Sequence, residues 1–216
     1  MYFSWVRVLS AAATLLAGAA LGAIGPFAGK FANPVCQTVA LVFSVGWSWA
    51  CFAFLVGYFK RSRIEAALLA SSALAVGVIV YYVLKFLEPT VPDGGQVISR
   101  GSVEEELLPR ILFWGTAAFV LGAPVGFAGN LARTLGVGGL PFRLVVPLIA
   151  FFEASERLGT EADSQGVTGE IAWNVIRVAA GVVAMTLAWH TVWRWWRARR
   201  SQPESRVEAG APPKHL

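Results

Sequence analysis

The chain has 216 residues, of which 56% are hydrophobic and only 14% are charged, and its mean hydropathy is +0.60. A soluble domain of this size could not cover so much apolar surface with polar side chains. The composition therefore indicates an integral membrane protein. The chain contains no P-loop, no GxGxxG motif after a strand and no GxSxG motif, so ATPase and soluble-enzyme functions find no support.

Six apolar stretches of the chain are long enough to cross a bilayer, which takes about 20 residues as a helix. Barrel strands would alternate polar and apolar residues, whereas these stretches are apolar on every face, so we expect helices. The prediction is an all-α, polytopic membrane helix bundle within residues 1–200, followed by a disordered cytoplasmic tail at 201–216. The six expected spans are residues 5–24, 34–59, 64–87, 109–129, 141–158 and 170–196.

The first stretch, residues 5–24, has an alternative interpretation as a cleaved signal peptide. It carries one arginine followed by a run of alanine and leucine that ends in small residues. Its apolar part is longer than the usual h-region of about 7–15 residues, however, so we keep it as a membrane helix.

The positions of the arginines and lysines predict the orientation of the bundle. Positive charges cluster at 60–63, in the connection near 133–143 and at 194–200, whereas the alternate connections carry acidic residues at 104–106 and 156–170. By the positive-inside rule both termini are cytoplasmic. We therefore expect the basic C-terminal end to contact lipid headgroups and expect no nucleic-acid partner.

Glu153 stands out because it lies inside the fifth span, directly after Phe151 and Phe152. It is four or five residues short of the outer end, a depth of roughly 6–8 Å, and Arg177 enters the sixth span to a depth of roughly 10 Å. A charge in hydrocarbon costs about 2.5–3.5 kcal/mol, so we expect Glu153 to face the bundle interior. Beside Arg177 it would stay ionised; among aromatic rings and amides, burial would favour the protonated carboxyl, which is a general acid.

A simpler interpretation of Glu153 needs no function. Arg157 follows four residues later on the same helix, so an ion pair near the interface would account for both side chains. The aromatic residues Tyr81, Tyr82 and Trp114 also have a simpler role, because aromatic belts are expected at both membrane interfaces.

The functional hypothesis is a membrane-bound terpene cyclase that begins the cyclisation of a prenylated, lipid-soluble substrate by protonation. Such chemistry needs a buried acid, a water-poor pocket and aromatic faces that stabilise carbocations. Glu153 would be the catalytic acid, no cofactor would be required, and the two cysteines and two histidines show no metal-ligand spacing. The expected substrate-binding residues lie in the outer half of the bilayer: Tyr81, Tyr82, Trp114, Phe151, Phe152, Asn174 and Arg177.

The layout of the chain also resembles known membrane proteins. The likeness rests on six expected helices, ANP at 32–34, the pair Tyr81 and Tyr82, FWGTAAFVLGAPVGFAG at 113–129 and FFE at 151–153. In these features, across most of residues 6–196, the chain resembles a group of small actinobacterial six-helix membrane proteins of poorly known function. It is also similar in size and polytopic layout to bacterial drimentine-type terpene cyclases, which implies a cyclase activity but assigns no catalytic residue.

The alternative hypothesis is a non-enzymatic membrane protein: a transporter or permease subunit, or an immunity factor. Glycines at spacings of three and four, such as Gly18, Gly22 and Gly25, allow helices to approach closely, within the chain or in a homo-oligomer. An independent transporter would be expected to show an inverted repeat or matching interrupted helices, and the sequence shows neither.

Overall fold

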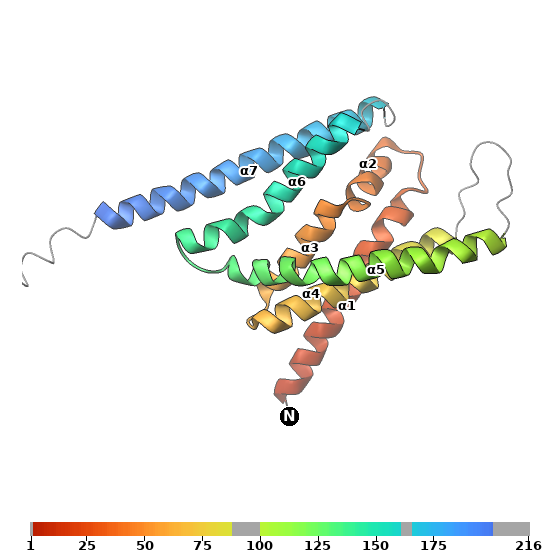
Figure 1. The fold of residues 1–216 in the computed structure, drawn as a ribbon, viewed down its shortest axis with the longest axis horizontal. Coiled ribbons are helices and arrows are strands. Elements are labelled where there is room, and N and C mark those ends of the chain that lie inside the picture. The colour runs from red at the N-terminus through yellow and green to blue at the C-terminus, as the bar shows by residue number, and fades with distance from the viewer. Residues whose placement is uncertain (1, 88–99, 161–165, 201–216) are drawn as a thin grey trace, which may run out of the picture.

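A computed structural model describes residues 2–87, 100–160 and 166–200, and what it describes is helical (Figure 1). The predicted all-α fold is confirmed. The predicted tail at 201–216 lies outside the described residues. The α-helices are α1 Tyr2–Ala28, α2 Pro34–Phe43, α3 Gly46–Phe59, α4 Arg63–Leu87, α5 Arg100–Leu131, α6 Leu140–Thr160 and α7 Gly166–Arg200, and a short 3-10 turn, η1 Val137–Gly139, precedes α6.

In the described part of the chain, five helices are long and apolar enough to cross a membrane. These are α1, α4, α5, α6 and α7. The shorter α2 and α3 pass the same test together, which raises the number of spans to six if the pair crosses as one. The chain thus has the build of a multi-pass membrane protein, in agreement with the predicted spans.

The second predicted span, residues 34–59, is wrong as a single helix, because α2 and α3 meet at an angle of 63°. The break falls at Ser44 and Val45; Val45 is extended, with φ −111° and ψ 157°. In hydrocarbon, the backbone groups that such a break frees must find partners inside the protein. The Ser44 N–H returns to the carbonyls of Ala40 and Leu41, and the indole N–H of Trp49 donates to the Phe43 carbonyl at 2.9 Å.

Glycines let the helices of the main bundle touch backbone to backbone. A Cβ atom at Gly22 of α1 would overlap the carbonyl of Gly77 in α4, and one at Gly57 of α3 would overlap the carbonyl of Gly126 in α5. Close backbone contact of this kind stabilises helix pairs in lipid, where no hydrophobic effect drives them together. The structure thus uses Gly18 and Gly22, which the sequence also offered for a homo-oligomer, to pack α1 against α4.

Helices α6 and α7 form an antiparallel hairpin at one side of this bundle (Figure 1). They pack mainly on each other, and they reach the rest of the chain chiefly through α2, α3 and the end of α5. A small buried cluster joins the hairpin to the break between α2 and α3: Val45, Ala154 and Trp173. The hairpin therefore meets the bundle at the break.

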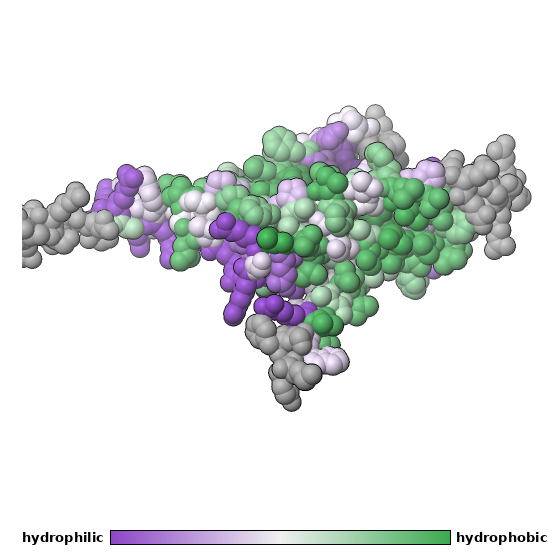
Figure 2. Space-filling model, turned by 60° about the horizontal axis from the view of Figure 1, so that its bottom comes forward, coloured by the Kyte–Doolittle hydropathy of each residue, from purple (hydrophilic) through white to green (hydrophobic). Residues whose placement is uncertain are grey.

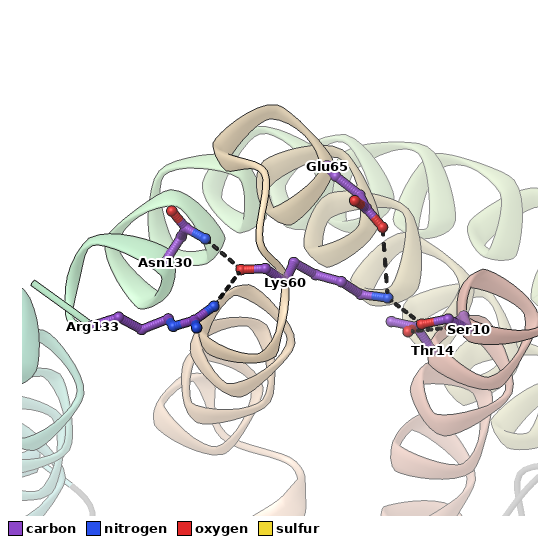
Figure 3. A network of polar contacts seen from close by, with 6 residues as sticks. All are labelled: Ser10, Thr14, Lys60, Glu65, Asn130 and Arg133. Atoms are coloured by element: carbon purple, nitrogen blue, oxygen red, sulfur yellow. Dashed lines mark hydrogen bonds and ion pairs between the residues drawn. The ribbon is translucent and has the colours of Figure 1, made fainter. Parts of the chain in front are cut away.

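At the end of the bundle where α3 stops and α4 begins, Lys60 joins four helices, α1, α3, α4 and α5 (Figure 3). Only 8% of Lys60 is exposed. Its ammonium donates to Ser10 Oγ of α1 at 2.6 Å and lies 3.9 Å from a Glu65 oxygen of α4. Its carbonyl, at the C-terminus of α3, accepts from Asn130 Nδ2 at 2.5 Å and from Arg133 Nη1 at 3.2 Å.

Replacing Lys60 with methionine tests this junction, because methionine keeps an unbranched apolar side chain and removes the charged donors. We expect a loss of about 1–3 kcal/mol of stability, since Ser10 and Glu65 lose the ammonium between them. Thermal unfolding of the purified protein in detergent measures the effect. Arg61→Met is the matched control, because Arg61 is exposed; equal melting temperatures for the two variants would contradict the role of Lys60.

Candidate functional site

Glu153 reaches from α6 to the beginning of α3. Its Oε1 accepts the Gly46 N–H at 2.9 Å and its Oε2 accepts the Trp47 N–H at 2.6 Å. The first N–H groups of a helix have no partner within the helix, and Val45, which precedes α3, offers no side-chain acceptor. The carboxylate fills this role and also faces the positive end of the helix dipole. Glu153 is therefore an N-terminal cap supplied from another helix.

Arg157, one turn further along α6, forms an ion pair with Glu153. Arg157 Nε lies 3.7 Å from Glu153 Oε1, and its guanidinium lies 5.4 Å from the ring centroid of Trp173, a side chain that is only 1% exposed. The pairing of Glu153 with Arg157, the simpler of the two sequence interpretations, is thus present. Arg177 instead donates to Asn174 Oδ1 at 3.1 Å on its own helix.

The aromatic residues near the break come from α3 and α4. Tyr81 packs edge-on against Trp49, with ring centroids 6.3 Å apart, and against Tyr82 at 5.3 Å. Gly25 of α1 lies against Tyr81 and Ser44, where a Cβ atom would come within 3.1 Å of the Ser44 hydroxyl. Tyr81 therefore lies beside the α2–α3 break.

The other predicted aromatic residues do not enclose Glu153. Trp114 is 52% exposed and packs edge-on against Phe113 on α5. Phe152 is 66% exposed, while the ring of Phe151 lies beside Gly181 of α7. Among the described side chains, these rings do not form a pocket around the Glu153 carboxyl.

A groove with a volume of about 430 Å³ lies between α2 and α7. Its wall is almost wholly apolar, and the hydroxyl of its one polar residue, Thr38, is already bonded to the Pro34 carbonyl at 2.9 Å. The groove does not include Glu153. It is lined by Thr38, Val42, Ile171, Ala172, Val175 and Ile176.

The described side chains form no group of three or more His, Cys, Asp or Glu that could hold a metal ion. The expectation of a metal-free, cofactor-free site stays a prediction. The chemistry that the site offers is a carboxylate on two backbone N–H groups, a guanidinium beside it and an apolar groove nearby.

Sequence reasoning missed the break and the groove. The signals for the break were Gly46 and the 26 residues of the stretch 34–59, which is more than the roughly 20 that a straight span needs. The groove had no local signal, since its two walls are more than 120 residues apart in the chain.

The chain matches no known protein family, and neither the curated proteins nor the solved structures contain a match. The resemblance drawn from the sequence layout stays a prediction.

Proposed function

We propose that this chain binds a lipid-soluble molecule with a long apolar tail in the outer half of the bilayer. The observation that supports the proposal is the groove between α2 and α7. Its volume of about 430 Å³ falls within the range of about 300–1,000 Å³ that is usual for small-molecule sites. The positive-inside orientation places the start of both helices at the outer interface.

The shape and chemistry of the groove fit an isoprenoid or similar tail. Two residues of the α7 wall, Ile171 and Val175, are 59% and 62% exposed, so the groove opens toward the surrounding lipid. An apolar molecule can therefore enter sideways from the bilayer without crossing water. Asn174 and Arg177 lie on the adjacent face of the same helix and offer polar contacts to a headgroup.

The enzymatic form of this proposal is the cyclase hypothesis, in which Glu153 protonates a prenylated substrate. The side chain of Glu153 is 19% exposed, so it is not completely buried. Both its oxygens accept backbone N–H bonds, however, and a protonated oxygen is a weaker acceptor than an ionised one. Protonation of Glu153 would therefore weaken its bonds to Gly46 and Trp47, which would couple acid catalysis to the stability of the helix break.

The second candidate is a non-enzymatic binding or transport subunit, and the capping role of Glu153 favours it. Broken helices near mid-membrane are common in transporters. An inverted repeat of three helices each would pair α1 with α5 and α4 with α7. The packing does not follow that symmetry, because α1 lies along α4 whereas α5 and α7 share no extensive contact. A subunit or carrier role fits better than a self-contained repeat transporter.

The test is photo-crosslinking of membranes that contain the chain, using a prenylated indole with a photoreactive group in the tail. We expect labelling of α2 and α7 peptides that an excess of unlabelled prenylated indole prevents. Val175→Trp should fill the groove and lower the labelling severalfold. Val182→Trp, two turns further along α7 and outside the groove wall, is the matched control. Equal labelling of both variants would contradict the proposed site.

The same membranes separate the two candidates when they are given a panel of prenylated indoles and prenyl diphosphates. A cyclised product that disappears in a folded Glu153→Gln variant would identify a cyclase. Competed labelling without any product would identify a binding or transport protein.

A further inference from the structure

The last turns of α7 carry a repeated arrangement of tryptophan and arginine. The Arg197 guanidinium lies 4.7 Å from the ring centroid of Trp193. The same spacing of four residues puts Arg199 at 3.9 Å over Trp195 and Arg200 at 3.5 Å over Trp196. We call residues 193–200 the tryptophan–arginine ladder. Each ring holds a guanidinium against its face, a contact that is stronger for tryptophan than for other aromatic side chains.

The ladder is exposed and carries charge of one sign. Its three rings are 39–44% exposed, and Trp189, 70% exposed, extends the row by stacking on Trp193 at 5.9 Å. The 30 residues from 171 to 200 contain no Asp or Glu. Figure 2 shows hydrophilic side chains gathered at this free end of α7, away from the rest of the molecule.

The length of α7 puts the ladder at the level of the lipid headgroups. Its 35 residues extend for about 52 Å, whereas the hydrocarbon layer is about 30 Å thick. Counted inward from Glu170 at the outer interface, about 20 residues of α7 cross the hydrocarbon layer, which then ends near His190. The rings then lie at the inner interface, where tryptophan is enriched in membrane proteins, and the arginines lie among the headgroups.

We propose that the tryptophan–arginine ladder binds the phosphate groups of anionic phospholipids in the cytoplasmic leaflet. A guanidinium presents a planar pair of donors to phosphate oxygens, and the ring beneath keeps it at the boundary of the apolar layer. An acidic protein or a nucleic acid would not require the rings to lie at that boundary. A lipid surface would contact both side chains of each pair: its phosphates would bind the arginine, and its apolar boundary would hold the tryptophan.

The proposal is tested by native mass spectrometry of the full-length protein, purified in detergent and mixed with phosphatidylglycerol or phosphatidylcholine. We expect the wild type to retain phosphatidylglycerol preferentially. Replacing Arg194, Arg197, Arg199 and Arg200 together with glutamine should abolish the preference for phosphatidylglycerol. Each arginine is expected to raise the affinity for an anionic surface about fivefold. Circular dichroism checks that the variant is still helical.

Two further variants make the result specific. The double variant Arg61→Gln, Arg63→Gln removes cytoplasmic charges that stack on no described ring and should keep the preference. The triple variant Trp193→Leu, Trp195→Leu, Trp196→Leu keeps every arginine and should lose most of it. The proposal is overturned if the wild type retains both lipids equally, if the arginine variant keeps its preference, if the control loses as much, or if the tryptophan variant loses nothing.

Discussion

Replacing Glu153 with glutamine is expected to destabilise the protein by about 1–3 kcal/mol, through the loss of a charged cap and the burial of a mismatched polar group. The amide keeps one acceptor oxygen, but its NH₂ group would face either the Gly46 N–H or the Trp47 N–H, donor against donor. Because these bonds also join the α6–α7 hairpin to α3, we expect the hairpin to loosen first.

The effect of Glu153→Gln is measured by thermal unfolding in detergent and by limited proteolysis of the connection between α5 and α6. Glu156→Gln is the control, because Glu156 is exposed on the same helix and caps nothing described. If both variants unfold at the wild-type temperature, the carboxylate does not stabilise the break. Glu153 would then be free for chemistry, and the cyclase hypothesis would gain.

Replacing Gly22 with alanine is expected to cost about 1–3 kcal/mol or more, although alanine is the better helix former by about 1 kcal/mol. The new methyl group would meet the backbone carbonyl of Gly77, which cannot turn aside as a side chain could. Helices α1 and α4 would have to separate along their whole contact. Gly57→Ala should behave in the same way, because it meets the carbonyl of Gly126 in α5.

The matched control for Gly22→Ala is Gly115→Ala, since a Cβ placed at Gly115 has no atom within 4 Å apart from those of its own helix backbone and its two chain neighbours. It should be neutral or slightly stabilising. The fraction of monodisperse protein after extraction and its melting temperature report both effects. A change of the same sign and size at Gly22 and Gly115 would show that the close backbone contact between α1 and α4 does not stabilise the fold.

The role of Glu153 bears directly on function. The carboxylate that the sequence suggested as an acid connects the α6–α7 hairpin to the start of α3 through two hydrogen bonds. A ligand in the groove beside Ile176 would lie next to the buried cluster of Val45, Ala154 and Trp173 at this connection. Ile176 thus belongs both to the groove wall and to the side chains packed on the cluster at the break, so a ligand in the groove could affect the geometry of the break.

Hydropathy alone was enough to predict the class of the protein and the approximate bounds of most of its helices. Stretches of about 20 apolar residues must be helical in lipid, because no water is present to satisfy the backbone. For that reason the expected spans at 64–87 and 141–158 agree closely with α4 and α6. The pair of Glu153 and Arg157 was also within reach, since it depends only on a spacing of four residues in one helix.

The break and the groove depend on contacts between residues that are far apart in the chain. A helix that starts inside a membrane needs acceptors for its free N–H groups. For α3 that acceptor is Glu153, which is more than 100 residues away from Gly46. The groove likewise exists because α2 and α7, far apart in sequence, lie side by side without filling the space between them. Local hydropathy records how apolar a residue is, and it carries no record of which distant residue meets it.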